Sequence, residues 1–292
     1  MIVPIVFGGT SESYPGDNRT TPPDGTMLKV VTDKLDSRWY NPAIWIGYPA
    51  QYAGVMSYEE SIAVAIQNAI PVINDILNNT NDQIVLLGYS QGAAIARRIL
   101  AQIGAGVHGT VDFFTGRVIG AGLIADPARP AGENLGPQIA PGYGIAGTEE
   151  VWEKAFLLEI ANPLDVICCA PHNSLIRTFS DFTGFFATDK ASLERWAATS
   201  IQKVKQRGWQ NSNLDWGQFW QIGQRVNEAV AGLQGYLPRH TRKNPLSWLP
   251  DIVMNPNGGQ HTRYHLDLIP GTRMTGCELL AFELNAAGER RA

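Results

Sequence analysis

The chain has 292 residues, of which 44% are hydrophobic and only 17% are charged. This length and this apolar content predict one large domain or two small ones, and they exclude intrinsic disorder as the main character of the chain. The net charge of −4 argues against a nucleic-acid-binding protein, which usually carries an excess of basic residues. No run approaches the roughly 20 apolar residues that span a bilayer.

In chain order, short apolar runs alternate with helical patterns up to residue 161. The apolar runs predict strands at residues 2–7, 43–48, 84–87, 117–124 and 155–161. Apolar residues at helical spacing predict helices at residues 26–38, 57–77 and 93–103. The second of these helices opens with the capping-box pair Ser57 and Glu60. Strands separated by helices favour right-handed βαβ units and a parallel sheet.

The pattern changes after residue 172. Two helical stretches and a proline-rich segment follow, at residues 190–206, 214–234 and 237–257. We therefore expect an inserted, mainly helical cap at residues 172–254. Residues 1–171 and 255–292 would then form the core of the protein.

The most informative motif is Gly88-Tyr89-Ser90-Gln91-Gly92, which has the pattern G-x-S-x-G. It follows a strand predicted to be buried and precedes an amphipathic helix. In such a strand–turn–helix the serine sits on a strained turn and its hydroxyl projects above the sheet. This context predicts an α/β-hydrolase fold, with a central, mostly parallel sheet flanked by helices and Ser90 as the nucleophile. The alternative is an ordinary turn in which Ser90 caps the helix.

A serine nucleophile needs a base, and the base needs an orienting acid. In this fold the acid comes next along the chain and the histidine comes last. His261 follows a run of turn-forming residues and precedes a predicted C-terminal helix, so we choose it as the base. His265 lies in the same region and is the alternative. The remaining histidines are poorer candidates because of their positions: His108, His172 and His240.

Two aspartates follow the strands that come after the nucleophile. Asp126 ends the first of these strands, and Asp165 ends the second. The acid of this fold usually follows the second strand, so Asp165 is the predicted acid. Asp126 is interpreted as a turn residue, with the role of the acid as its alternative.

An oxyanion hole needs two donors aimed at the developing negative charge. The main-chain N–H after the nucleophile belongs to Gln91, and we choose Thr10, in the loop Gly9-Thr10-Ser11, as the second donor. That loop lacks the G-K-[ST] ending of a phosphate-binding loop. Because this chemistry requires neither a metal nor a cofactor, we expect none.

The cysteines are Cys168, Cys169 and Cys277. Neighbouring Cα atoms lie about 3.8 Å apart, below the usual disulfide range of about 4.4–6.8 Å. A bridge between Cys168 and Cys169 is therefore disfavoured. A bridge from Cys277 to one of them stays open beside the interpretation as buried free thiols.

Four segments resemble the cutinase-like branch of the α/β hydrolases: Phe7-Gly8-Gly9-Thr10, Tyr48-Pro49-Ala50, Gly88-Tyr89-Ser90-Gln91-Gly92 and Asn162-Pro163-Leu164-Asp165. Within this branch the chain resembles the mycobacteriophage lysin B family most. The resemblance covers most of residues 1–170 and 255–285. A helical insertion between the acid and the histidine is typical of the lysin B family.

The resemblance implies that Ser90, His261 and Asp165 form the catalytic triad and that Thr10 and Gln91 are the oxyanion donors. It also implies a mycolylarabinogalactan esterase, which cleaves the ester between mycolic acids and cell-wall arabinogalactan during lysis of a bacterial host by a phage.

Two further features bear on the resemblance. His261 and Tyr264 resemble the His-x-x-Tyr stretch of cutinase-like enzymes. Cutinases flank their acid with a disulfide, but Ala161 stands where the upstream cysteine would be, and only Cys168 has a counterpart.

The expected partners are the mycolyl ester of cell-wall arabinogalactan, or other lipid esters, and the surface of the lipid-rich outer layer. The N-terminus has no basic region typical of a signal peptide, so we expect a protein made in the host cytoplasm that acts at the host envelope during lysis. The alternative functions are a general cutinase-like lipase or esterase, an acyltransferase with the same triad, and a non-catalytic wall-binding protein on a hydrolase scaffold.

Overall fold

The sheet of the computed structural model has five parallel strands among the described residues, in the order β2-β1-β3-β4-β5. The described residues are 1–52, 55–109, 114, 116–148, 151–172, 174–184, 190–206, 209–210, 241–242, 252–253 and 259–291. The strands are β1 (Ile2–Phe7), β2 (Ile44–Trp45), β3 (Gln83–Tyr89), β4 (Val118–Ile124) and β5 (Phe156–Ile160). This sheet, with helices on both faces, confirms the predicted α/β-hydrolase fold class.

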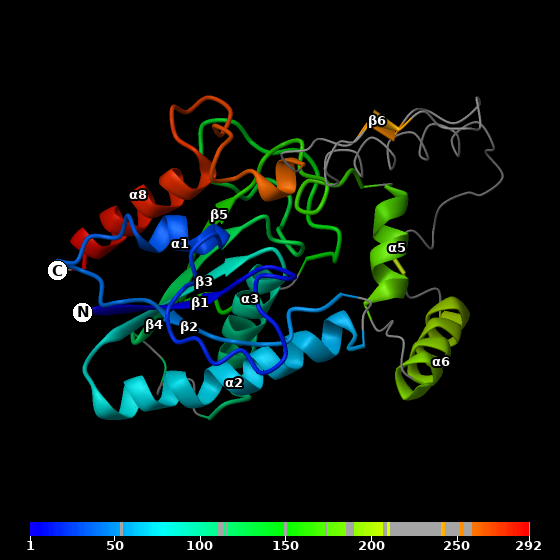
Figure 1. Ribbon diagram of the computed structural model, residues 1–292, viewed down its shortest axis with the longest axis horizontal. Coiled ribbons are helices and arrows are strands. Elements are labelled where there is room, and N and C mark those ends of the chain that lie inside the picture. Colours follow the sequence, from blue (N-terminus) through cyan, green and yellow to red (C-terminus); the bar gives the residue numbers. More distant parts are fainter. Residues whose placement is uncertain are drawn as a thin grey trace.

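Helices cover both faces of the sheet (Figure 1). One face carries α1 (Met27–Thr32) and α8 (Gly276–Glu289), and the other carries α2 (Tyr58–Asn79) and α3 (Gln91–Gly104). Each face of the sheet has its own hydrophobic core, and alternate residues of β1 point into the two cores. Ile5 and Phe7 pack toward α2 and α3, and Val6 packs toward α1 and α8. Strands buried on both faces read as continuous apolar runs, which is why the sequence pattern located them.

Two predicted elements are shorter in the structure than in the sequence pattern. The strand expected at residues 43–48 has only two residues, because the chain then turns to contact the preceding loop. The Tyr48 amide donates to the Ser13 hydroxyl at 3.0 Å, and a Cβ on Gly47 would lie 2.0 Å from the Asp17 carbonyl oxygen. The helix expected at residues 26–38 ends at Thr32, where the following residues form tighter turns.

The capping box predicted from Ser57 and Glu60 is confirmed. The Ser57 hydroxyl accepts from the Glu60 amide at 3.2 Å, and the Glu60 carboxylate accepts from the Ser57 amide at 3.1 Å. These bonds fix the first residue of α2, which lies next to the carboxyl-terminal edge of the sheet. No helix in the described part of the chain is long and apolar enough to cross a membrane.

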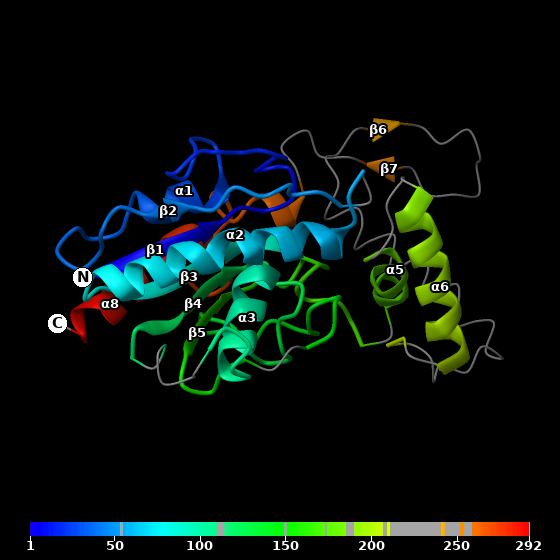
Figure 2. The same cartoon turned by 90° about the horizontal axis from the view of Figure 1, so that it is seen from below.

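Two helices of the region after residue 172 lie beyond the carboxyl-terminal edge of the sheet (Figures 1 and 2). They are α5 (Leu175–Thr183) and α6 (Lys190–Gln206), and the second matches the helix predicted at residues 190–206. The short pair β6 (Thr241–Arg242) and β7 (Ile252–Val253) follows. The helix predicted at residues 214–234 lies outside the described residues, and the division into core and cap stays a prediction.

The end of α5 is attached to the core and to α6. The Glu59 amide at the start of α2 donates to the Gly184 carbonyl at 3.1 Å, and the Tyr52 and Thr183 hydroxyls are hydrogen-bonded. From α6, Trp196 donates to the Phe182 carbonyl at 2.6 Å. The bonds to Gly184 and Phe182 satisfy carbonyl groups that a helix end leaves without intrahelical donors.

A fully buried arginine holds the loops that follow β4 and β5. The Arg129 guanidinium donates to the carbonyl oxygens of Pro130, Glu133, Pro141, Gly142 and Cys168, at distances between 2.8 and 3.0 Å. One side chain therefore joins the loop after β4 to the segment that carries Asp165.

We expect Arg129→Met to lower the free energy of unfolding by about 3 kcal/mol or more, because several buried carbonyl groups lose their donor at once. Urea unfolding followed by circular dichroism measures the change. The control is Arg38→Met, since the Arg38 side chain is 73% exposed and its loss should change stability by about 0.5 kcal/mol or less. An equal effect of both substitutions would contradict the role assigned to Arg129.

Candidate active site

Ser90 lies on a strained turn between β3 and α3. Its backbone has φ 54° and ψ −116°, and its amide donates to the Ile124 carbonyl of β4 at 2.9 Å. A non-glycine residue with positive φ is uncommon and persists where its surroundings enforce it. Here the turn lifts the Ser90 hydroxyl to the carboxyl-terminal edge of the sheet.

The two glycines of the motif are required by close backbone approach. A Cβ on Gly88 would lie 2.4 Å from the Gly92 carbonyl oxygen, and one on Gly92 would lie 2.1 Å from the Phe7 carbonyl oxygen. Any side chain at either position would displace the turn or strand β1. This is the steric reason for glycine on both sides of Ser90.

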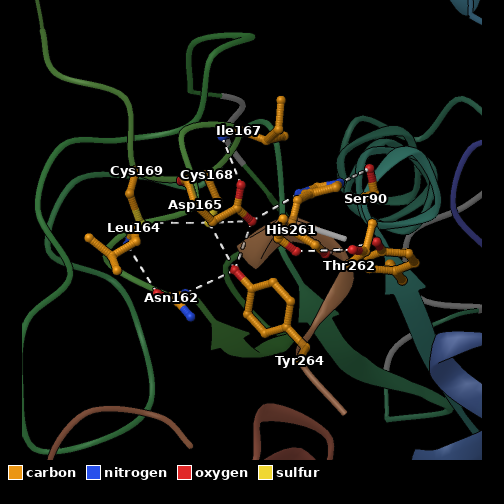
Figure 3. A network of polar contacts seen from close by, with 12 residues as sticks. Ser90, Asn162, Leu164, Asp165, Ile167, Cys168, Cys169, His261, Thr262 and Tyr264 are labelled. Carbon is orange, nitrogen blue, oxygen red and sulfur yellow. Dashed lines mark hydrogen bonds and ion pairs between the residues drawn. The ribbon is translucent and has the colours of Figure 1, made fainter. Parts of the chain in front are cut away.

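His261 reaches Ser90 from a 3-10 turn, η1 (Gln260–Thr262), although the two residues lie 171 positions apart. Its Nε2 lies 2.8 Å from Ser90 Oγ (Figure 3). The Tyr89 hydroxyl donates to the His261 carbonyl at 2.8 Å and so anchors this turn to the end of β3. His265, the alternative base, is exposed.

The remaining histidines of the described residues lie elsewhere. His108 contacts Gln102 at 2.7 Å, and His172 contacts the Tyr143 hydroxyl at 3.1 Å. His240 lies outside the described residues. Among the candidate histidines that the structure describes, His261 is therefore the one that lies at Ser90.

Asp165 completes the hydrogen-bonded chain. Its Oδ2 lies 2.9 Å from His261 Nδ1, and both side chains are almost fully buried. Because an ionised carboxylate only accepts hydrogen bonds, Nδ1 carries the ring proton and Nε2 is left to accept from the Ser90 hydroxyl. This tautomer is the one that can take a proton from serine.

The surroundings of Asp165 keep its carboxyl ionised. Burial alone would raise its pKa, but the attraction of His261 and hydrogen bonds from His261, the Ile167 amide and Tyr264 lower it below the usual value. The Ile167 amide donates to Oδ1 at 3.0 Å, and the Tyr264 hydroxyl donates to Oδ2 at 2.8 Å. The carboxylate is thus held by donors from both sides (Figure 3).

Tyr264 also connects two parts of the loop after β5, which carries the acid and is called the acid loop below. Its hydroxyl accepts from the Asn162 amide at 2.9 Å while it donates to Asp165. The Cys168 sulfur lies 3.3 Å from the same hydroxyl and 3.4 Å from the carboxylate. The His-x-x-Tyr spacing was the only signal in the sequence for Tyr264. No signal in the sequence indicated that Tyr89 anchors the turn that carries His261.

Asp126, the alternative acid, belongs to a different buried cluster. Its carboxylate accepts from Arg97 Nε at 2.6 Å and from the Ala128 amide at 2.9 Å. The interpretation as a turn residue is thus incomplete, because Asp126 forms a turn and also neutralises a buried arginine of α3. Arg97 contacts Glu159 as well, and burial together with the neighbouring Asp126 raises the pKa of the Glu159 carboxyl.

Thr10 and Gln91, the predicted oxyanion donors, lie side by side. The Thr10 hydroxyl donates to Gln91 Oε1 at 3.2 Å, and Gln91 Nε2 donates to the Gln51 carbonyl at 3.1 Å. Gln91 is the first residue of α3, where main-chain N–H groups lack intrahelical acceptors and favour negative charge. Its N–H is therefore suited to hold an oxyanion formed at Ser90.

Glu12 supports the loop that carries Thr10. Its carboxylate accepts from the Gly9 amide and from the Met27 amide, each at 2.7 Å. Burial raises the pKa of this carboxyl despite these two bonds. The sequence analysis did not identify this residue, because a lone glutamate after a glycine turn has no distinctive pattern.

The three cysteines are buried free thiols. The sulfur of Cys277 contacts Met27, at 3.5 Å from its sulfur, and does not pair with another cysteine. The bridge to Cys277 that the sequence left open is therefore not formed. Among the described residues, no cluster of three or more histidine, cysteine, aspartate or glutamate side chains could hold a metal ion.

A pocket of about 310 Å³ opens beside Ser90, His261 and Thr10. Apolar side chains form much of its lining: Pro127, Ile145, Ala146, Ile167 and Ile176. The pocket also reaches α3, the start of α2, and helices α5 and α6. The geometry at Ser90 therefore adjoins a space that can hold part of a substrate.

The sequence matches the family model described as Cutinase over residues 17–176, which is more than half of the chain. The matched segment includes Ser90 and Asp165 and ends before His261. No curated protein matches the chain.

Several solved structures are similar. Lysin B from Mycobacteriophage D29 has 18% identity and a TM-score of 0.48, with 78% of this chain and 86% of that chain covered. A cutinase-like protein from a Cryptococcus species has 20% identity and a TM-score of 0.42, with 70% and 90% covered. An acetyl xylan esterase has 20% identity and a TM-score of 0.42, with 69% and 98% covered.

We expect Tyr264→Phe to shift the acid limb of the activity profile to higher pH. The hydrogen bond from Tyr264 is one of the interactions that lower the pKa of the Asp165 carboxyl, so its loss raises that pKa and leaves more of the enzyme with a neutral Asp165 at a given acidic pH. The pH dependence of kcat/KM for a soluble ester measures the shift.

Cys168→Ala is the matched control, since the thiol is a weak donor to the same carboxylate and its loss should move the limb less. A Tyr264→Phe enzyme with reduced stability but an unshifted acid limb would contradict the assigned role.

Proposed function

The chain belongs to the cutinase family, and we propose that it hydrolyses carboxylic esters with Ser90 as the nucleophile, His261 as the base and Asp165 as the orienting acid. The observation that carries this proposal is the unbroken hydrogen-bonded chain from Ser90 Oγ through His261 to Asp165, at 2.8 and 2.9 Å. A serine hydroxyl becomes a competent nucleophile only with such a base at hydrogen-bonding distance.

The mechanism follows from the positions of these groups. His261 Nε2 takes the Ser90 proton while Oγ attacks the ester carbonyl carbon, and the Gln91 N–H and Thr10 hold the resulting oxyanion. The imidazolium then gives its proton to the departing alcohol, which leaves the acyl group on Ser90. Water, activated by the same imidazole, attacks the acyl-enzyme and releases the acid and free Ser90.

We further propose that the natural substrate is the ester between mycolic acids and arabinogalactan, and that the enzyme acts at the envelope of a mycobacterial host during phage lysis. The support is the motif resemblance to the lysin B family together with the long insertion between acid and base. Asp165 and His261 are 96 residues apart, and α5 and α6 belong to that interval.

The second candidate is a general cutinase-like esterase without preference for the cell wall. The apolar lining of the pocket suits lipid esters of many kinds, which favours this candidate. Relative activity on purified mycolylarabinogalactan and on tributyrin separates the two. Free mycolic acid released from purified wall by the wild type, and not by Ser90→Ala, would support the specific substrate.

Ser90→Ala should lower kcat for p-nitrophenyl butyrate by about 10⁴–10⁶-fold, the usual size of the effect when a triad nucleophile is lost. Circular dichroism checks that the variant is folded. Wild-type activity in the folded variant would refute the proposed mechanism.

Asp165→Asn should lower kcat by about 10⁴-fold, because the amide favours the wrong tautomer of His261. The matched control is Asp126→Asn, which replaces a buried carboxylate that pairs with Arg97. It should reduce stability while leaving most of the activity of the folded enzyme. A larger loss of kcat in the Asp126 variant than in the Asp165 variant would show that Asp165 is not the acid.

Covalent labelling tests whether the scaffold is catalytic at all. A fluorophosphonate should modify the wild type at Ser90, and Ser90→Ala should remain unlabelled. An unlabelled wild type would favour a wall-binding protein without activity.

A further inference from the structure

Helices α3 and α5 form two walls of the pocket, and both walls extend away from the catalytic residues. On α3, Arg98 lies eight residues after Ser90, and on α5, Gly184 lies eight residues after Ile176. Ser180 lies midway along the α5 wall, since helical residues four apart share a face. At 1.5 Å per residue, each wall extends about 12 Å from the catalytic end.

The end of the pocket next to the catalytic residues is apolar. Ile167 lies beside the acid, because its amide donates to Asp165. The Ile145 amide donates to the Ile167 carbonyl at 2.9 Å, and both isoleucines pack against the cluster that contains Ile176. The first part of the pocket is therefore suited to a hydrocarbon chain.

The far end of the pocket carries charges. Arg98 binds Glu59 through two bonds, of which Nη2 to Oε1 measures 3.0 Å, and the Glu59 amide donates to the Gly184 carbonyl. The Glu59 and Arg98 side chains are 26% and 23% exposed. Lys203 of α6 also lines the pocket there and donates to the Asp181 carbonyl at the end of α5.

An apolar chain that reached this ion pair would remove its remaining water without offering a hydrogen bond, which is unfavourable. An extended chain advances about 3.3–3.6 Å for every three bonds. The distance of about 12 Å along α3 therefore corresponds to about ten bonds. Beyond that length an alkyl chain gains no further apolar contact in the pocket.

The order of events favours the acyl part of the ester as the occupant. The alcohol must leave before water attacks the acyl-enzyme, whereas the acyl group stays bound to Ser90 through both steps. A pocket that adjoins Ser90 is therefore suited to the part of the ester that stays on Ser90 through both steps.

We propose that this pocket binds the acyl chain and that the Glu59–Arg98 ion pair limits the bound chain to about ten bonds. The proposal rests on the esterase activity proposed above and on no particular alcohol. An acyl group with longer chains, such as a mycolyl group, would continue outside the pocket.

The test compares p-nitrophenyl esters from butyryl to hexadecanoyl, all at the same detergent concentration. Replacing both charges together, as Glu59→Leu with Arg98→Met, leaves no unpaired charge behind. The ratio of kcat/KM for hexadecanoyl over octanoyl should rise about tenfold over the wild type, since a long chain no longer has to desolvate the Glu59–Arg98 ion pair.

The matched control is Asp36→Leu with Arg38→Met, which makes the same replacements in an ion pair near the amino-terminal end of β1. Its ratio should equal that of the wild type. A Glu59→Leu, Arg98→Met enzyme that is folded and keeps the wild-type ratio would overturn the proposal.

A second variant tests the path without touching the ion pair. Ser180→Phe should block the pocket halfway, so activity on octanoyl should fall about tenfold, a loss of about 1.4 kcal/mol, while butyryl activity stays near wild type. Equal effects on both esters would contradict the assigned path along α5.

Further measurements separate this proposal from binding of the alcohol and from failure of the proposed function. For butyrate esters of alcohols of increasing length, kcat/KM should depend on alcohol length in the same way in the wild type and in the Glu59→Leu, Arg98→Met enzyme. A change in the variant that is confined to this alcohol series would assign the pocket to the alcohol. Absence of butyrate hydrolysis by the wild type would refute the proposed function itself. Hydrolysis with an unchanged length profile would refute only the role of the ion pair.

Discussion

The buried carboxylate of Asp165 is the group on which the rest of the site depends. A charge removed from water must be compensated by donors on every side, and here they come from the Ile167 amide, His261, Tyr264 and the Cys168 thiol. Satisfying this one group fixes the tautomer of His261 and the path of the acid loop. The resemblance to cutinases implies a disulfide beside the acid, whereas the cysteines here are free thiols. The Tyr264 hydroxyl joins Asn162 to Asp165 by hydrogen bonds instead.

The parallel sheet supplies the geometry in which these loops meet. Because the carboxyl ends of its strands share one edge, the Thr10 loop after β1, the turn after β3 and the loops after β4 and β5 all converge there. Positive φ marks backbone strain at Ser11 after β1, Ser90 after β3 and Ala125 after β4, and also at Ala50 in the segment after β2. Buried Arg129 and the Arg97–Asp126 pair hold the loops after β4 against that strain. The same convergence forms the pocket, and α5 and α6 extend it away from Ser90.

Much of the fold was predictable because its signals are local. Strands buried on both faces need continuous apolar runs, and the runs at β1, β3, β4 and β5 located them. The strand at residues 43–48 was overestimated, since the Trp45 and Tyr48 amides donate to a loop contributed by residues 13–20. The pairing of Asp126 with Arg97 was not predicted, because Arg97 is 29 residues away on another element. Such pairings depend on where the sheet places α3.

The sequence by itself predicted Ser90 as the nucleophile, since that prediction needs only a short apolar strand, two glycines and a helix around the serine, all within a few residues. It also narrowed the acid to Asp126 or Asp165 and the favoured bases to His261 or His265. Only the tertiary structure decided between these pairs, because the choice depends on which side chains meet across 96 and 171 residues of chain. The roles of Tyr89 and Tyr264, and the ion pair at the end of the pocket, are set in the same way. Their chemistry lies in contacts between distant segments, and such contacts leave no local pattern in the sequence.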